Sequence, residues 1–434
     1  MLRVNGYYKL GDVSEKIGSG STPKGGQSVY IEEGVSLIRS QNVYNMEFSY
    51  DGLAHIDDNA ANKLKNVALK EEDILLNITG DSVARCCMVP KGVLPARVNQ
   101  HVSIVRVDKS LINPKYLMYY LVSPFMQKYL IMLAQGKGAS RSALTKGMIS
   151  KLDIPKIDLD SQTNISSSLE IYDFLIENNN KRIKILEQMA EELYKEWFIR
   201  FRYDSKKIEY QESNLGMIPS TFNVVPIGEL IDYYIGGGWG NDNKSDEYCE
   251  EAFVIRGADF PNVRIGDIST TPLRFHKKSN YDKRKLLPGD IVIEISGGTE
   301  EKPVGRTILI TDELLTEFSY SVICASFCKL IRVSKEKISP IYLHYWMNYM
   351  YETRMIDRFQ LQSTGIINFK FEYFLRKGLV LIPPKDLMVE FEEKTKILKK
   401  QIDLLSIKNS NLREQRDLLL PRLMSGKLEI KESE

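Results

Sequence analysis

The stretch LEIYDFLIENNNKRIKILEQMAEELYKEWF, residues 169–198, decides the fold, because its apolar residues recur at every third or fourth position. The steps alternate between three and four along the series Ile165, Leu169, Tyr172, Ile176, Asn179, Ile183, Leu186, Ala190, Leu193 and Trp197. This spacing is the period of a coiled-coil seam. A helix over this range would be roughly 50 Å long. So regular a seam predicts a partner helix.

A second seam of the same kind lies near the end of the chain. It consists of Met388, Phe391, Thr395, Leu398, Ile402, Leu405, Asn409, Leu412, Arg416, Leu419 and Leu423. We expect the two helices to run antiparallel with Asn179 facing Asn409, because a buried Asn facing Leu would cost about 1–3 kcal/mol in lost hydrogen bonds. The same register pairs Leu186 with Ile402 and Trp197 with Phe391. The alternative is that one asparagine is solvated at the edge of the seam.

The rest of the chain repeats itself. SLIRSQNV at 36–43 corresponds to FVIRGADF at 253–260, and EEDILLNITG at 71–80 to PGDIVIEISG at 288–297, both 217 residues apart. VRVDKSLINPKYLMYYL at 105–121 corresponds to IRVSKEKISPIYLHYWM at 331–347, now 226 residues apart. We expect the nine extra residues around GGTEEKPVGRT, 297–307. The order along the chain is therefore domain, helix, domain, helix.

Each repeat mixes strands with helices. Short apolar runs at 73–78, 101–107, 290–295 and 327–333 predict buried strands. Residues 113–133 and 339–356 predict helices, each with a capping Asn or Ser followed by proline. Glycine-rich and polar loops lie at 18–26, 135–147, 236–244 and 296–306, and they differ most between the repeats.

Composition bounds the class of protein. The 434 residues suffice for two or three domains, and the net charge is +2. Residues 1–150 hold 18 Lys or Arg and 13 Asp or Glu, a surplus that is compatible with a phosphate-binding surface. The sequence shows no membrane-length apolar run and no signal-peptide core at its start. The five cysteines form no metal-binding or disulfide pattern, so we expect a reduced, cytoplasmic protein.

Motifs for catalysis are not found in the sequence. It has no phosphate-binding G-x-x-x-x-G-K-[ST], no zinc-binding H-E-x-x-H and no Asn-Pro-Pro-Tyr or Asp-Pro-Pro-Tyr of the amino-methylating DNA enzymes. The four histidines are scattered. We therefore predict no catalytic residue and no metal site.

The chain resembles a known family, the specificity subunits of type I restriction–modification systems. LYKEWFIRF at 193–201 is similar to the end of the family's first long helix, and LREQRDLLLPRLMSGKLEI at 412–430 to its closing helix. ESNLGMIPSTFNVVPIGEL at 212–230 is similar to the usual entry to the second half, with Phe222 where tryptophan is common. A second departure is GGGWGNDN in the second half, where the first has GSGSTPKGG.

The resemblance implies an α+β fold in which two repeated target-recognition domains are separated by two long antiparallel coiled-coil helices with pseudo-twofold symmetry. The expected limits are 1–158 for the first recognition domain, 159–202 for the first helix, 203–384 for the second domain, 385–426 for the second helix and 427–434 for a tail.

The implied function is non-catalytic recognition of a bipartite, asymmetric site in double-stranded DNA, which directs adenine methylation or cleavage by partner subunits. The implied partners are two methyltransferase subunits and restriction subunits that translocate DNA. S-adenosylmethionine, ATP and Mg would belong to those partners, and this chain would bind no cofactor.

Polar loop residues are the candidates for contact with DNA, since Arg, Lys, Asn and Gln read base edges and bind phosphates. They are Lys24, Gln41, Asn42, Arg85, Lys137 and Arg141 in the first half, and Asn241, Asn243, Lys244, Lys302, Arg306 and Gln362 in the second. Each could equally be an ordinary solvated loop residue. Arg39 and Arg256 are equivalent in the repeat, which suggests a shared structural or phosphate-binding role.

Apolar residues beside the seams are the candidates for binding a methyltransferase partner. They are Tyr194, Phe198, Leu418 and Leu420, which could instead pack on the adjoining domains. Two rival functions remain open at this point. One is a recognition subunit for another class of methyltransferase–nuclease, and the other is a coiled-coil adaptor that binds no DNA.

Overall fold

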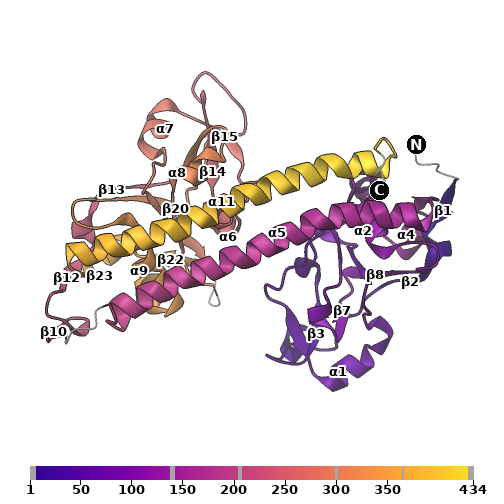
Figure 1. Ribbon diagram of the computed structural model, residues 1–434, viewed down its shortest axis with the longest axis horizontal. Helices are drawn as coiled ribbons and strands as arrows, with labels where there is room; N and C mark the ends of the chain where they lie inside the picture. Colours follow the sequence, from indigo (N-terminus) through magenta and orange to yellow (C-terminus); the bar gives the residue numbers. More distant parts are fainter. Residues whose placement is uncertain (1–5, 137–141, 204–207, 299–301, 364–365, 429–434) are drawn as a thin grey trace, which may run out of the picture. The chain divides into compact units, whose positions relative to one another are not determined.

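The computed structural model describes residues 6–136, 142–203, 208–298, 302–363 and 366–428 (Figure 1). Contacts within the chain divide it into two compact units. Unit 1 comprises Met1–Leu175 and Leu412–Glu434, and unit 2 comprises Ile176–Asn411. Each unit combines a globular α+β part with segments of two long helices, α5 (Leu159–Tyr194) and α11 (Lys385–Met424).

The globular part of unit 1 is built on two sheets. The antiparallel sheet has the order β2 (Ser14–Ser19), β8 (Val102–Val107), β5 (Ile74–Asn77), β6 (Cys86–Met88). The mixed sheet has the order β4 (Ala54–Ile56), β3 (Val35–Ile38), β7 (Ala96–Val98). Strand β1 (Tyr7–Lys9) pairs with β9 (Asp153–Pro155). The helices are α1 (Asp58–Lys63), α2 (Pro114–Val122), α3 (Pro124–Gln135) and α4 (Lys146–Ser150).

Unit 2 carries the same central sheet, in the order β13 (Ile231–Gly236), β20 (Cys328–Val333), β16 (Ile291–Glu294), β18 (Thr307–Leu309). Its mixed sheet has the order β15 (Leu273–His276), β14 (Glu250–Ile255), β19 (Ser321–Cys324). A further sheet has the order β17 (Ser296–Gly298), β22 (Ile366–Phe369), β21 (Gln360–Ser363).

The remaining elements of unit 2 cover these sheets. Strand β10 (Tyr210–Ser213) pairs with β11 (Gly216–Pro219), and β12 (Asn223–Pro226) with β23 (Leu379–Ile382). The helices are α6 (Phe260–Arg264), α7 (Lys278–Arg284), α8 (Asp312–Thr316), α9 (Pro340–Glu352) and α10 (Phe371–Lys377).

Equivalent ion pairs show that the two units share a scaffold. In unit 1, the buried carboxylate of Asp73 accepts two hydrogen bonds of 2.7 Å from Arg106. In unit 2, Asp290 accepts two of 2.8 Å from Arg332. The carboxylates are 217 residues apart and the arginines 226, which are the two offsets of the sequence repeat. Each pair joins adjacent strands of the central sheet, so the internal repeat is structural.

The heptad seam predicted from the sequence is occupied by contacts within each unit. In unit 2, Asn179 Nδ2 donates a 2.9 Å hydrogen bond to Asn409 Oδ1, and both side chains are buried. Around it Ile183, Ile402 and Leu405 form a small core against which Leu186 packs. In unit 1, Ile165 and Leu169 of α5 share a core with Leu420 and Leu423 of α11. Where the unit 1 seam is polar, Arg416 Nη1 pairs with Asp173 Oδ1 at 2.6 Å.

Some helix predictions were wrong at their ends. Residues 113–133 form two helices, because the extended Ser123 (ψ 146°) precedes Pro124, whose ring disfavours a helical residue before it. Helix α9 stops at Glu352, and Arg354 is left-handed with φ 61°. After Tyr194 the helix α5 widens into one π-helical turn, Lys195–Ile199.

No helix among the described residues is long and apolar enough to cross a membrane.

Candidate nucleic-acid interface

The glycine-rich loops begin at equivalent places in the two units. A Cβ on Gly20 would lie 2.0 Å from the carbonyl oxygen of Val98, and a Cβ on Gly237 would lie 2.2 Å from that of Cys324. Only glycine fits so close to a neighbouring backbone. Beyond these points the loops differ in sequence and structure. Lys24 is exposed at the turn of the first loop.

Asn42 is unsuited to contacting DNA, contrary to the prediction. Its side chain is fully buried, where Nδ2 donates to the carbonyls of Ser49 and Asp51, at 2.9 and 3.2 Å, and Oδ1 accepts from the amide of Arg39. All of its hydrogen-bonding capacity therefore holds the turn that follows β3. Its neighbour Gln41 is exposed, with only a long contact of 3.4 Å to Gly52 O.

Arg39 and Arg256 have structural contacts at equivalent turns. Arg256 makes two hydrogen bonds to the carboxylate of Asp259, at 2.9 and 2.8 Å, and it also binds the carbonyl of Thr270. The Asp259 hydrogen bond raises the pKa of Arg256 above its usual value. Arg39 instead donates to the carbonyl of Gly52 and lies over the ring of Tyr30. These contacts account for the structural role expected from the repeat.

Arg85 and Arg306 differ in their surroundings. Arg85 lies with its guanidinium carbon 4.8 Å from the centre of the Tyr44 ring, a cation–π contact. Arg306 makes two hydrogen bonds of 2.8 Å to the carboxylate of Glu294, and these raise the pKa of Arg306. Neither Tyr44 nor Glu294 was singled out from the sequence. The repeat alignment held the signal, because it places Glu294 opposite Asn77.

The second glycine-rich loop is tied to strand β15. The backbones of Asn241 and Phe275 exchange hydrogen bonds of 2.8 and 3.0 Å. Arg274 lies 4.6 Å from the Trp239 ring centre and pairs with Asp242. The side chain of Asn241 faces its own loop, with Oδ1 accepting from the Asp242 amide. The sequence did not single out Trp239 and Arg274, since their contact depends on the fold of the loop.

The other candidates of unit 2 are peripheral. Asn243 is exposed, and the exposed Lys244 pairs with Glu251 at 3.3 Å. Lys302 is exposed, and Gln362 belongs to β21 with its backbone opposite Ile367. In unit 1, Lys137 and Arg141 lie outside the described residues.

Most of the residues predicted to bind a protein partner are inside the fold, which corrects that prediction. Tyr194 and Phe198 are buried in the core of unit 2, where both rings pack against Phe391 and Tyr342. Leu420 is buried in the core of unit 1. The alternative reading, that these residues pack on the adjoining domain, applies to all three. Leu418 is 56% exposed and stays a candidate.

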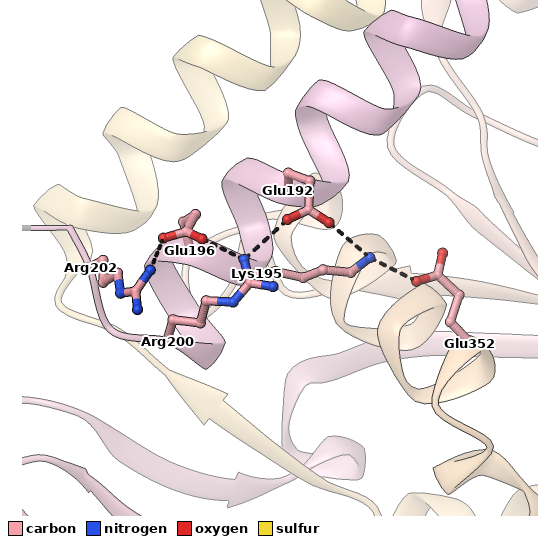
Figure 2. A network of polar contacts seen from close by, with 6 residues as sticks. All are labelled: Glu192, Lys195, Glu196, Arg200, Arg202 and Glu352. Atoms are coloured by element: carbon pink, nitrogen blue, oxygen red, sulfur yellow. Dashed lines mark hydrogen bonds and ion pairs between the residues drawn. The ribbon is translucent and has the colours of Figure 1, made fainter.

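A network of charged side chains surrounds the end of α5 in unit 2 (Figure 2). Its members are Glu192, Lys195, Glu196, Arg200, Arg202 and Glu352. Lys195 Nζ lies 3.3 Å from the carboxylate of Glu352, the last residue of α9, so the network links two helices. A hydrogen bond from Arg200 lowers the pKa of Glu192. Exposed pairs of this kind add little stability singly, and their role is to orient the π-helical turn.

Potential metal ligands do not gather in groups of three or more among the described His, Cys, Asp and Glu residues. The buried cysteines are poor nucleophiles, since burial raises the pKa of Cys324 to about 12 and keeps its thiol protonated. The described arrangement thus consists of exposed, differing loops on a repeated scaffold.

Comparison with known proteins identifies the scaffold. Residues 5–188 match the family described as "Type I restriction modification DNA specificity domain". The chain is 23% identical to the type I restriction enzyme MjaVIII specificity subunit of Methanocaldococcus jannaschii, over 99% of each chain. It is 21% identical to the type I restriction enzyme HindI specificity subunit of Haemophilus influenzae, over 97% of this chain and 99% of that one.

A solved structure has the same fold. The crystal structure of a type I restriction–modification S subunit from M. genitalium superposes with a TM-score of 0.51 at 14% identity, covering 97% of this chain and 96% of that one. The fold and the near full-length sequence matches agree with the internal repeat. The chain belongs to the family of specificity subunits of type I restriction–modification systems.

Proposed function

We propose that this chain recognises a two-part, asymmetric DNA sequence, with the globular part of each unit reading one part. The observation that carries the proposal is a duplicated scaffold with unequal loops. Asp73–Arg106 and Asp290–Arg332 are retained in both copies, whereas the loops at 18–26 and 236–244 differ. Two different reading surfaces on one scaffold suit a site whose two parts have unrelated sequences.

The long helices would act as spacers between the two recognition domains, with the limits 1–158 and 203–384 for the domains. Two readers in the major groove on one side of B-DNA need centres about 34–36 Å apart per helical turn. Segments of α5 and α11 with a fixed register suit that task, because a helix changes length only by whole residues. The buried Asn179–Asn409 hydrogen bond supports a fixed register within unit 2.

The chain is a non-catalytic subunit, as its family implies. Adenine methylation would be carried out by two bound methyltransferase subunits, and DNA translocation and cleavage by restriction subunits. S-adenosylmethionine, ATP and Mg would bind to those partners, and the complex would work on double-stranded DNA in the cytoplasm. Exposed apolar residues of the helices, such as Leu418, Ile185 and Met189, would meet a methyltransferase subunit.

DNA binding by the complex with its methyltransferase partners tests the role directly. A reader that contacts 6–10 phosphates loses about 10³–10⁵ in affinity between 50 and 200 mM salt, because binding releases counterions. We expect such a loss on DNA that contains the recognised site. Affinity that is absent, or independent of salt, would favour a coiled-coil adaptor instead.

A further inference from the structure

The internal repeat places Arg85 and Arg306 at the same backbone position. In unit 1 the amide of Asn77 donates to Arg85 O at 2.8 Å, and the amide of Ala84 donates to Asn77 O at 2.9 Å. In unit 2 the amide of Glu294 donates to Arg306 O at 2.9 Å, and that of Gly305 to Glu294 O at 3.0 Å. The strand registers β5–β6 and β16–β18 agree with this equivalence.

The residue before each arginine is left-handed, with φ 73° at Ala84 and 110° at Gly305. This conformation is unfavourable for alanine, which has a Cβ, and so it stores strain in unit 1. The turn directs the following side chain out of the strand. Both units therefore form the same turn in front of the same residue type.

The arginine is retained although its ion-pair partner is not. Position 294 is a glutamate that binds Arg306, whereas the equivalent residue in unit 1 is Asn77. Asn77 is turned away from Arg85, because its Nδ2 donates to the carbonyls of Ser40 and Val43 at 2.9 and 3.3 Å. By contrast, the structural pairs Asp73–Arg106 and Asp290–Arg332 keep both partners. A purely structural role does not explain an arginine that outlasts its carboxylate.

The two guanidinium groups offer different donors. Within the described part of the chain, no hydrogen bond or ion pair engages the guanidinium of Arg85, and none of its nitrogens is buried without a partner. All of its N–H groups are thus open to solvent. In Arg306 the Nε and one Nη2 hydrogen are taken by Glu294, while Nη1 is neither hydrogen-bonded to a described residue nor buried. The Nη1–Nη2 edge of Arg306 is left.

These differences fit different partners on DNA. A carboxylate on the Nε–Nη2 side fixes the plane of Arg306 and neutralises its charge, so little attraction to phosphate remains. The remaining fork of two donors matches O6 and N7 of guanine in the major groove. Arg85 keeps its whole positive charge and rests on the face of Tyr44, which suits a phosphate oxygen.

We propose that the arginine at this shared position contacts DNA in both units, with Arg306 reading a guanine and Arg85 holding a backbone phosphate. Glu294 is then a positioning residue for base reading. The proposal rests on the function proposed above. It assigns one base-specific contact to the part of the site read by unit 2, and one contact without base preference to unit 1.

The test uses the complex with its methyltransferase partners and duplexes that carry its site, each altered at one base pair. Arg306→Gln and Arg306→Lys should both lose roughly 5- to 150-fold discrimination at one G·C pair, since lysine lacks the fork. Arg85→Gln should weaken binding to all duplexes alike and reduce the slope of log affinity against log salt by about 0.9, the share of one phosphate. Arg85→Lys should restore that slope.

Glu294→Gln separates positioning from stability. It removes the compensating charge beside Arg306, so discrimination at the same G·C pair should fall while the salt slope steepens by about 0.9. The matched control is Arg376→Gln, which removes the charge of an exposed arginine on α10 of the same unit and should leave discrimination unchanged. Melting curves of all variants check that each is folded.

Two results would overturn the inference. If Arg306→Lys keeps full discrimination at every base pair of a complex that still reads a two-part site, Arg306 reads no guanine and the proposed function stands. If Arg85→Lys and Arg85→Gln behave alike, with an unchanged salt slope, Arg85 holds no phosphate. A wild-type complex without any site preference overturns both the inference and the proposed function.

Discussion

Asn409 is the centre of a small buried amide cluster. It accepts a hydrogen bond of 2.9 Å from Asn179 and donates one of 2.8 Å to Oδ1 of Asn180. The sequence predicted the partner on the seam, because both seams place an asparagine at one heptad position. It did not indicate Asn180, which lies one residue off the seam and reaches Asn409 from the side.

Replacing one seam asparagine should destabilise the protein. In Asn179→Leu the buried amide of Asn409 loses a donor and faces a hydrocarbon, at a cost of about 1–3 kcal/mol. The melting temperature should fall, and Asn179→Leu with Asn409→Leu should recover part of the loss. The exposed Asn178→Leu is the control. A melting temperature that Asn179→Leu leaves unchanged would show that the pair does not hold the register.

Side chains that read DNA are harder to infer from sequence than those that hold the seam. Asn42 and Arg306 both stand in polar loop sequence, yet one closes a turn and the other is bound by Glu294. The sequence has no period that reports such contacts, because they join residues brought together by the fold. Only the comparison of the two repeats carried information about them.

At the scale of elements, an aromatic cluster joins α5, α9 and α11 within unit 2. Phe391 is fully buried, and its ring centre lies 5.1 Å from Phe198, 5.9 Å from Tyr194 and 6.3 Å from Trp197. The seam predicted the Trp197 contact. It did not predict the burial of Tyr194 and Phe198, because the helix α9 that covers them belongs to a distant part of the sequence.

Truncating the central ring should unfold unit 2 at lower denaturant concentration. Phe391→Ala leaves a cavity among these aromatic side chains and should cost about 3–5 kcal/mol. Phe174→Ala on α5 is the control, since that ring is 62% exposed and its loss should change the midpoint little. Equal midpoints for the two variants in urea unfolding would contradict the packing described.

Helix α9 makes stability depend on pH. His344 lies on it, bonded to Thr307 and Asn348, and burial lowers the pKa of His344 well below its usual value, as do the charges of Arg264 and Lys399. Below about 6.5 the unfolded chain therefore binds a proton that the folded protein refuses. The free energy of unfolding should be fully present above that pH and fall as the pH is lowered.

A substitution isolates this effect. Between pH 7 and 5 the melting temperature of the wild type should fall further than that of His344→Gln, which has no proton to take up. Glu187 and Glu191 line the same cavity with raised pKa values and act in the opposite sense, but they are present in both proteins and cancel. Parallel curves for the two proteins would rule out His344 as the source.

At the scale of the whole chain, a repeated scaffold with differing loops is the central feature. The strands predicted at 73–78, 101–107, 290–295 and 327–333 are β5, β8, β16 and β20, since short apolar runs between turns have few alternatives. The extra residues of the second copy were expected in one loop. The pairing of β16 with β18 instead places Arg306 opposite Arg85, an offset of 221, so the insertion is split on either side.

The most direct test of the account is the methylated sequence that the complex leaves on DNA. Genomes of cells with and without this chain should differ in methylated adenines at one asymmetric site made of two short parts with a fixed gap. Exchanging the segment 1–158 for that of another family member should change one part and keep the other part and the gap. A single continuous motif, or a change in both parts after that exchange, would contradict the account.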